Sequence, residues 1–449
     1  MNKINTNPRE ILQARSVMIE YTRDQAKALI HISTFLESKD NFYLLIGNAG
    51  TGKTTIAENI ARYSNASMLA PTNAAIKRLK DKFMCEEIPR NRFQTIHQTL
   101  YGAPNEETGE FEPKEGLKNS PVYIIDESSM IEKKILDDLI KEAIKNNKKL
   151  VFMGDDFQLE PVGEDPLLFK WEESLSSVNN IFKKHWRFKL NEVKRNQGTI
   201  LAIATRLRNS ENCSVLGYDN EDFQIVSRFS SNLPLCISHM TDFVVLVSTN
   251  KRRIKYNEQI RIAKFEEDAK EIVVDGEKLI SVSNQQYLNG EMYTIKYPKV
   301  TKEFKAIINV GSKKYPEIAE YKFYLVEHEI EGLVSTHRTL MVPNLDKASL
   351  HPSQLMHIKE IYSDYNIMDY NPRMRKKVWN KNVNIATYGY ATSVHKSQGN
   401  EWDTVYIDCD WLSPNWNHAR WLYTAITRAK KRVELKNSRY FNIIPKEDG

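Results

Sequence analysis

One octapeptide has the composition and spacing of a phosphate-binding loop. Residues 47–54 read GNAGTGKT, which fits the pattern G-x-x-x-x-G-K-[ST]. Glycines let backbone N–H groups surround phosphate oxygens, and the N-terminus of a following helix adds partial positive charge. A glycine turn that only begins a helix is the alternative. The apolar run before this segment and the helical pattern after it favour a nucleoside triphosphate site formed by Gly47, Asn48, Ala49, Gly50, Thr51, Gly52, Lys53, Thr54 and Thr55.

Within this loop, Lys53 would reach the β- and γ-phosphates, and the Thr54 hydroxyl would bind Mg²⁺. Two acidic residues, Asp126 and Glu127, directly follow the apolar run 122–125. An acidic residue at the carboxyl end of a parallel strand faces the phosphate crevice of the sheet. We therefore expect Asp126 to hold Mg²⁺ and Glu127 to act as the base that orients or deprotonates the attacking water.

Hydrolysis of a nucleoside triphosphate also requires cations that neutralise the departing phosphoryl group. Arginine does this through a rigid fork of donors. Arg195 and Arg428 are the candidates. Taken alone, each fits a surface salt-bridge partner better, and only the sequence around it favours a catalytic role.

These residues need a scaffold in which strands end next to helices. Short apolar runs alternate with helical stretches, which predicts a parallel sheet covered on both faces. The strands are expected at 42–46, 67–70, 122–125 and 150–153, and the helices at 21–36, 54–63, 74–83 and 132–144. A second alternating unit is expected to begin near Lys189, with segments at 199–208, 243–248, 252–264, 384–388, 404–407 and 418–427.

Two stretches interrupt this alternation. Residues 98–120 are polar and rich in turn formers, and they are too long for a simple strand-to-helix connection. Residues 270–382 carry glycines and many Val, Ile and Tyr at short spacing. This pattern predicts a small antiparallel β module followed by a helical part rich in Lys and Arg. We expect both stretches to be insertions into the α/β units.

The composition is that of a globular protein with several domains. The 449 residues are 41% hydrophobic and 27% charged, and the net charge of +6 permits a polyanionic partner without requiring one. Four widely spaced cysteines argue against a zinc site and for a reducing compartment. No stretch approaches the ~20 apolar residues of a membrane span, and no signal-peptide core is visible near Met1, so we expect a cytoplasmic protein without a membrane partner.

Seven short segments, in this order along the chain, resemble the motifs of one enzyme family. Residues 21–25 (YTRDQ) resemble its Q motif, 70–75 (APTNAA) motif Ia, 126–130 (DESSM) motif II, 154–159 (GDDFQL) motif III, 194–195 (KR) motif IV, 390–399 (YATSVHKSQG) motif V and 422–429 (LYTAITRA) motif VI. The chain therefore resembles the superfamily-one DNA helicases of subgroup B, in their RecD/Dda branch. Its compact length and the placement of its insertions are most similar to the phage Dda type.

This resemblance implies an α/β fold with two RecA-like parallel-sheet domains that clamp one ATP. The first domain would comprise 1–97 and 121–188, with a pin insertion at 98–120. The second would comprise 189–269 and 383–449, with a small src-homology-3-like β-barrel and an extension inserted at 270–382.

The resemblance also implies roles for single residues. Gln25 would bind adenine, Glu401 would hold the ribose, and Gln158 would sense the γ-phosphate. The catalytic set would be Lys53, Glu127, Gln158, Arg195 and Arg428, with ATP and Mg²⁺ as cofactors.

A track for single-stranded DNA is implied as well, formed by Pro71, Thr72, Asn73, Thr95, His97, Thr249, Asn250, Thr392, His395 and Lys396. We expect its histidines to hydrogen-bond DNA and to transfer no proton. Phe111 resembles the aromatic residue at the pin tip, where stacking on the last base pair would offset part of the unstacking cost; packing against its own domain is the alternative. Trp379 would either stack on a base or anchor the extension.

The function expected from these residues is that of an ATP-dependent DNA helicase that moves along single-stranded DNA, in the 5′→3′ direction that subgroup B implies. A translocase that displaces proteins with little unwinding needs the same motor and stays open as the alternative. A P-loop kinase or GTPase would explain 47–54 but not Arg428 with its neighbours, and a non-enzymatic nucleic-acid-binding module would not need the phosphate-site residues. The implied partners are single-stranded and forked duplex DNA, and single-strand-binding and replication proteins. The implied setting is a monomer at replication or recombination forks, in the host cytoplasm if the chain is phage-encoded.

Overall fold

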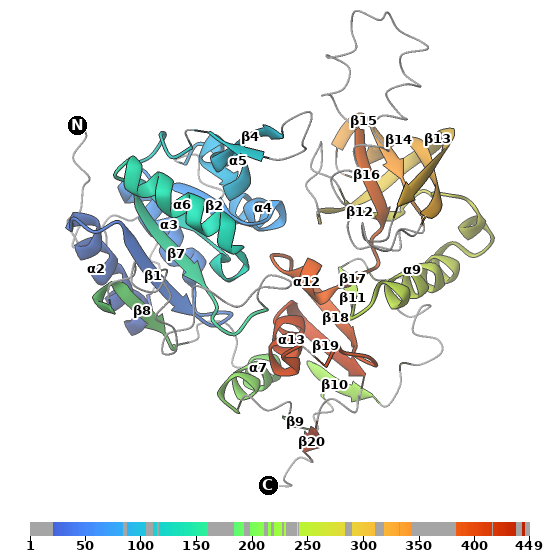
Figure 1. Cartoon of the computed structure of the whole chain (residues 1–449). Coiled ribbons are helices and arrows are strands. Elements are labelled where there is room, and N and C mark those ends of the chain that lie inside the picture. Colours follow the sequence, from blue (N-terminus) through green and yellow to red (C-terminus); the bar gives the residue numbers. More distant parts are fainter. Residues whose placement is uncertain are drawn as a thin grey trace, which may run out of the picture. The chain divides into compact units, whose positions relative to one another are not determined.

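The computed structural model describes residues 21–83, 88–104, 111–114, 116–159, 184–192, 198–210, 214–216, 220–226, 229, 240, 242–282, 290–309, 318–331, 333–343, 383–414, 416–436 and 442–444. The chain forms two compact units, one of 1–212 with 417–427 and one of 213–416 with 428–449 (Figure 1). Each unit contains a parallel sheet, and each is described by itself.

The sheet of the first unit has the order β3-β2-β6-β7-β1-β8, and all its neighbouring strands are parallel. Its strands are β1 (Phe42–Gly47), β2 (Ser67–Ala70), β3 (Phe93–Thr95), β6 (Val122–Ile125), β7 (Lys149–Gly154) and β8 (Arg187–Leu190). The four strands expected from the sequence are confirmed. The prediction that the second unit begins near Lys189 is wrong, because β8 pairs with β1 at the edge of the first sheet.

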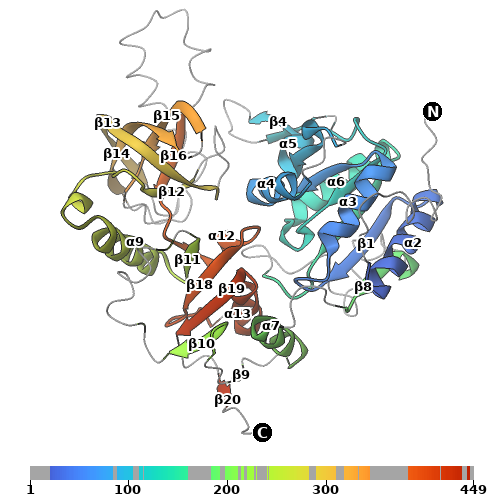
Figure 2. The same cartoon turned by 180° about the vertical axis from the view of Figure 1, so that it is seen from behind.

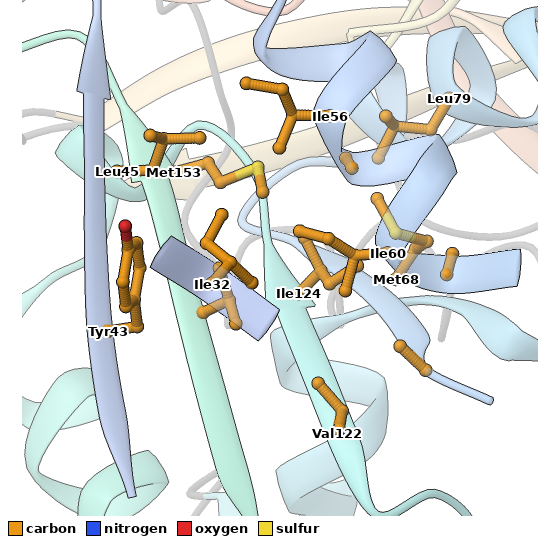
Figure 3. Packing of buried hydrophobic residues seen from close by; sticks show 14 of the residues in the cluster. Ile32, Tyr43, Leu45, Ile56, Ile60, Met68, Leu79, Val122, Ile124 and Met153 are labelled. Carbon is orange, nitrogen blue, oxygen red and sulfur yellow. The ribbon is translucent and has the colours of Figure 1, made fainter. Parts of the chain in front are cut away.

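Both faces of this sheet are covered by helices, as predicted (Figure 2). All six residues of β1 are buried, and they alternate between two clusters. Tyr43 and Leu45 pack with α2 (Arg23–Glu37), α3 (Lys53–Ser64) and α4 (Asn73–Lys82), as Figure 3 shows. Leu44 and Ile46 pack with α5 (Ile96–Leu100) and α6 (Lys133–Lys145) on the other face. A strand buried on both faces carries no polar position, which is why β1 reads as a continuous apolar run.

The second unit is built on a five-stranded parallel sheet with the order β10-β19-β18-β11-β17. Its strands are β10 (Phe223–Val226), β11 (Phe243–Val247), β17 (Ala391–Ser393), β18 (Trp402–Asp408) and β19 (Ala429–Lys436). Helix α9 (Asn250–Phe265) follows β11, and the short helix α12 (Val394–Ser397) follows β17. A small separate pair joins β9 (Ser214–Leu216) to β20 (Asn442–Ile444).

A closed five-stranded barrel confirms the β module expected in 270–382. Its strands are β12 (Lys278–Ser281), β13 (Met292–Asn309), β14 (Ile318–Ile330), β15 (Leu333–Met341) and β16 (Val383–Tyr388). The expectation that residues 384–388 resume the parallel sheet is wrong, because β16 closes the barrel against β12 and β15. An apolar strand fits either sheet equally well, so only the pairing decides its place. The extension at 344–382 lies outside the described residues.

The barrel and the second parallel sheet share one hydrophobic cluster and are joined by a polar network. Arg261 of α9 forms a buried ion pair with Glu277, with 2.9 Å between Nε and Oε2. The Tyr390 hydroxyl donates to the same carboxylate over 2.9 Å and accepts from the backbone N–H of Lys278. Asn257 of α9 accepts from the backbone N–H of Tyr390. Tyr390 thus connects the barrel, α9 and the chain that enters β17.

Two further helices and a hairpin complete the described elements. Helices α7 (Thr199–Ser210) and α13 (His418–Ile426) pack against each other within the first unit. Inside 98–120, β4 (Tyr101–Pro104) and β5 (Phe111–Pro113) form an antiparallel pair. Short 3₁₀ turns lie at Arg90–Arg92, Ser128–Met130, Lys184–Trp186 and Glu266–Lys270. In the described part of the chain, no helix has the length and apolar character to cross a membrane.

Candidate nucleotide and DNA site

The loop between β1 and α3 has the backbone that a phosphate cradle requires. Gly50 and Gly52 have φ values of +80° and +81°, a region that residues with a Cβ rarely adopt. Gly52 caps α3 without a side-chain hydrogen bond, so the helix N-terminus is left to other acceptors. The Lys53 ammonium donates to the carbonyls of Gly47 over 2.5 Å and Asn48 over 3.0 Å. Burial lowers its pKa, while Asp155, Glu127 and Asp126 oppose that shift.

Gln25 lies directly against this loop. Its side-chain N–H donates to the Thr51 carbonyl over 2.9 Å, and its side-chain oxygen accepts from the Thr22 N–H over 3.0 Å. Thr22 and Gln25 together form the capping box of α2. A Cβ on Gly52 would collide with the Gln25 amide. The structure therefore gives Gln25 a role in holding the loop, and its contact with adenine stays a proposal.

Asp126 and Glu127 lie at the end of β6, with 3% and 5% of their surfaces exposed. Glu127 has a φ of +50°, which turns the chain sharply after the strand. The guanidinium of Arg78, on α4, contacts both carboxylates: its Nη2 is 3.2 Å from Oδ2 of Asp126 and 2.8 Å from Oε1 of Glu127. Burial and the neighbouring Glu127 raise the pKa of Asp126, and Arg78 and Lys53 counteract this.

The segment after β7 is connected to the phosphate loop through α13. Asp155 is fully buried and accepts from Tyr423 over 2.5 Å and from Arg208 of α7 over 2.6 Å. The Tyr423 hydroxyl also accepts from the backbone N–H of Ala49 over 3.3 Å. Burial, followed by Asp155, raises the pKa of Tyr423 well above its usual value, so the phenol keeps its proton. This chain of hydrogen bonds ties the loop backbone to the end of β7.

Gln158 is held beside this network by its backbone. Its carbonyl accepts from Arg420 over 3.3 Å, and the next N–H, of Leu159, donates to Thr424 over 3.0 Å. The Gln158 side-chain oxygen is buried, and it has no hydrogen-bond partner among the described residues. A buried carbonyl oxygen without a donor costs stability, which is consistent with a site that gains a donor from a bound water or ligand.

The oxygen donors of Thr54 and Asp126 fit Mg²⁺. Mg²⁺ prefers oxygen ligands and typically takes one or two from the protein, with phosphates and water supplying the rest. The described residues contain no group of three His, Cys, Asp or Glu side chains suited to a metal ion. A bound Mg²⁺ would supply positive charge to the phosphate oxygens.

Two of the predicted nucleotide residues, Arg428 and Glu401, belong to the second unit. Arg428, with 2% of its surface exposed, follows α13 and donates to the Asn400 carbonyl over 3.4 Å. The Arg428 carbonyl accepts from the Trp402 N–H over 2.9 Å, so Arg428 lies beside the residues on either side of Glu401. Arg195 lies outside the described residues.

Within the first unit, the predicted DNA residues cluster at the ends of two neighbouring strands. Thr72 follows β2 and caps α4 by accepting from Ala75 N–H. Thr95 ends β3 and caps α5 through a capping box. Pro71 and Asn73 flank Thr72, and Asn73 is buried. His97 is half-buried on α5, where burial, followed by Lys134, lowers its pKa.

The second unit repeats this arrangement. Thr249, after β11, caps α9 by accepting from Arg252 N–H, and Asn250 is the first residue of that helix. Thr392 lies in β17, and its buried hydroxyl has no hydrogen-bond partner in the described structure. His395 and Lys396 follow on α12. Burial lowers the pKa of His395, and burial and the nearby Arg253 lower the pKa of Lys396 to about 7.

Two predicted DNA contacts cannot be placed. Phe111 begins β5, so its backbone lies in the hairpin, and its side chain is outside the described structure. Trp379 lies outside the described residues altogether.

Several residues of the site were not found from the sequence. Arg78 contacts the predicted carboxylate of Glu127, and Arg208 and Tyr423 contact Asp155. The charge of Arg253 acts on Lys396. Arg78 lies about one helical turn beyond the APTNAA segment. Helical periodicity counted from Thr72 was therefore the sequence signal that could have placed Arg78 near the site. An aromatic pair, Trp411 and Trp416, lies near His395, with ring centroids of Trp416 and His395 5.3 Å apart.

Comparisons with known proteins agree with this geometry. Residues 20–220 match a family described as an AAA domain, and residues 388–435 match the UvrD-like helicase C-terminal domain. The ATP-dependent DNA helicase Dda of Enterobacteria phage T4 is 28% identical over 321 residues, which cover 64% of this chain and 69% of Dda. A RecD subunit of the RecBCD enzyme from Buchnera aphidicola (subsp. Schizaphis graminum) is 30% identical over 157 residues, which cover 30% of this chain and 26% of RecD. These matches make the chain similar to the RecD/Dda-like helicases of superfamily one, subgroup B.

Further similarities extend over nearly the whole helicase. The uncharacterized protein R530 of Acanthamoeba polyphaga mimivirus is 24% identical over 499 residues, which cover 92% of this chain and 98% of that protein. A Bacteroides Pif1 helicase, solved in complex with ADP-AlF3 and single-stranded DNA, has a TM-score of 0.50 and 16% identity, with coverage of 96% and 95%. A Pif1 structure that addresses unwinding at forked duplex DNA has a TM-score of 0.53 with the same identity and coverage. At this identity, the Pif1 structures establish the shared fold.

Proposed function

We propose that this enzyme, an ATP-dependent DNA helicase, moves 5′→3′ along single-stranded DNA and separates duplex DNA ahead of it. The observation that carries the proposal is the placement of both sets of residues at one edge of the first sheet. Lys53, Asp126 and Gln158 follow β1, β6 and β7, and the capped helices α4 and α5 follow the neighbouring strands β2 and β3. Nucleotide chemistry and DNA contact would therefore act through the same strand ends.

The hydrolytic step would depend on charge and position. Lys53 and the loop N–H groups would hold the phosphates, and Thr54 and Asp126 would hold Mg²⁺. Glu127 would orient the attacking water or accept its proton, and Gln158 would sense the γ-phosphate. Arg195 and Arg428 would neutralise charge on the departing phosphoryl group. Gln25 would bind the adenine, and Glu401 would hold the ribose.

DNA would be held at the ends of the strands in both units. Thr72, Thr95 and Thr249 direct helix N-termini to the same edge as their strands, and such N-termini favour phosphate oxygens. Lys396 would add a charge that follows the phosphate backbone. Cycles of ATP binding and hydrolysis would change how tightly each unit holds the strand. We further propose that Phe111 stacks at the fork, that Trp379 contacts a base, and that the enzyme works as a monomer.

A forked-duplex assay tests the activity and its direction together. Duplexes with a 5′ tail only, a 3′ tail only, or both are mixed with enzyme and ATP, and strand separation is followed by fluorescence. Separation that requires the 5′ tail and ATP is the expected result, with Lys53→Ala as the inactive control.

Three other outcomes contradict parts of this proposal. Dependence on a 3′ tail would reverse the direction. Displacement of streptavidin from tailed DNA without strand separation would favour a translocase. Absence of ATP hydrolysis in the presence of single-stranded DNA would contradict ATP-driven translocation.

A further inference from the structure

Arg78 lies where the DNA-facing and hydrolytic parts of the first unit meet. It belongs to α4, the helix that begins at Asn73 directly after the cap Thr72. Its guanidinium reaches across to the end of β6 and contacts both Asp126 and Glu127. Helix α4 therefore has a proposed DNA contact at its N-terminus. Farther along, the same helix carries the arginine that contacts the proposed catalytic base, Glu127.

The contact suits a restraint on the base. Glu127 is almost fully buried, and a guanidinium nitrogen 2.8 Å from its oxygen engages that oxygen in a charge-assisted hydrogen bond. A carboxylate oxygen held in this way is occupied by the guanidinium and is not free to accept a proton from an attacking water. Arginine also keeps its charge at any pH of interest, so only movement can release Glu127.

Helix α4 is built to transmit such movement. The Thr72 hydroxyl fixes its first turn through Ala75 N–H, and Ile76 and Leu79 anchor it to the core with 2% and 0% exposure. A packed helix shifts as a unit, and hydrogen bonds weaken steeply with distance and angle. A small displacement at Thr72 would therefore be felt at the contact between Arg78 and Glu127.

We infer that Arg78 is a positioning residue that restrains Glu127 in the DNA-free enzyme and releases it when single-stranded DNA binds at the N-terminus of α4. The inference rests on the proposed function, and it adds the route by which DNA controls hydrolysis. The restraint is a contact within one unit and needs no second copy or further protein.

The decisive variant is Arg78→Gln, assayed for ATP hydrolysis with and without oligothymidylate. We expect the DNA-independent rate to rise about tenfold, a size typical of coupling between two sites. The rate at saturating DNA should stay within about twofold of the parent, so the stimulation ratio falls.

Two variants serve as controls. Lys80→Gln removes an exposed charge from the same helix and should leave the ratio unchanged. Arg78→Lys keeps the charge but loses the fork that spans two carboxylates, so its DNA-independent rate should fall between those of the parent and Arg78→Gln. It also serves as the test if thermal melting shows that Arg78→Gln does not fold.

The outcomes separate this inference from the proposed function. Equal loss of both rates in Arg78→Gln would show a structural or directly catalytic role and overturn the restraint. An unchanged ratio would overturn it as well. Absence of any DNA-stimulated hydrolysis in the parent enzyme would instead overturn the proposed function.

Discussion

The two units end their neighbouring strands in the same way but surround those ends with different charges. In the first unit, Thr72 and Thr95 cap helices after β2 and β3. In the second, Thr249 and Ser393 cap helices after β11 and β17, which are also neighbours. A capping hydroxyl satisfies one helix N–H and leaves others for an external acceptor. The shared geometry suits a strand of phosphates in both units.

The two units differ in the charged side chains that lie near these capped helices. In the first unit, the buried carboxylates Asp126 and Glu127 lie at the same sheet edge as Lys53. In the second, Lys396 of α12 is a half-buried amine whose pKa is lowered by burial and by the charge of the buried Arg253. Carboxylates activate water and hold Mg²⁺, whereas cations attract phosphates, so hydrolysis and DNA affinity should respond to changes in different units.

The largest difference between the effects on hydrolysis and on DNA binding is expected for Lys53→Ala in the first unit. Loss of the ammonium removes the charge that holds the nucleotide phosphates, so DNA-stimulated hydrolysis should fall by at least about 10³. Affinity for single-stranded DNA should be retained. Phosphate release measures hydrolysis, and the anisotropy of labelled oligothymidylate measures DNA binding. Lys27→Ala, at an exposed position of α2, is the control. Normal turnover would remove Lys53 from the nucleotide site.

Arg428→Ala would sharpen the comparison, because a residue of the second unit is expected to affect hydrolysis. As a phosphoryl-neutralising arginine, its loss should lower kcat by about 10³ while ATP binding persists. Stopped-flow binding of a fluorescent ATP analogue separates these steps. Arg432→Ala on β19 is the matched control. A variant with normal kcat would exclude Arg428 from the mechanism.

Phe111→Ala tests the insertion of the first unit. Loss of stacking on the terminal base pair should slow unwinding about tenfold, because aromatic stacking contributes energy comparable to base-pair opening. Translocation along single-stranded DNA should be unaffected. Forked-duplex unwinding and arrival at a labelled DNA end are compared, with Glu112→Ala as control. Equal unwinding by variant and parent would leave Phe111 as a packing residue.

The smallest effect is expected at Lys396, where charge depends on pH. Because burial and Arg253 lower the pKa of Lys396 to about 7, raising the pH through 7 neutralises it and should weaken DNA binding. Lys396→Ala should cost about fivefold in affinity at pH 6, the size of one phosphate contact near 0.1 M salt, and less at pH 8.

The controls for this pH dependence use charge and position. Lys396→Arg should bind equally at both pH values, because arginine stays protonated. Lys251→Ala, at an exposed position of α9, keeps Lys396, so its affinity should fall with rising pH as the parent's does. The same loss for Lys396→Ala at pH 6 and pH 8 would contradict a titrating contact.

The sequence predicted those site residues whose signal is local. Lys53 is marked by the glycines around it, and Asp126 by the apolar strand before it, so each was placed on the correct element. Their partners carry no local signal. Tyr423 and Asp155 are 268 positions apart, and Arg78 and Asp126 are 48 apart, so their contacts exist only after the sheet has assembled.

The fold shows the same limit. The sequence predicted a strand at 384–388 but placed it in the second parallel sheet, and it began the second unit near Lys189, where the structure has β8. Strand propensity depends on side-chain packing and burial, and an edge strand of one sheet reads like a strand of another. Pairing partners decided these two cases: β1 for β8, and β12 with β15 for β16.

Tyr390 has a mechanical consequence for the second unit. Its hydroxyl is bound to Glu277 and Lys278 at the base of the barrel, its N–H to Asn257, and its carbonyl to Val245 of β11. Four residues later α12 begins, and it carries His395 and Lys396. Breaking one partner of a buried ion pair is costly, so these contacts hold the barrel in place against α9 and the parallel sheet. Tension applied to the barrel is passed directly to the turn that carries these two side chains.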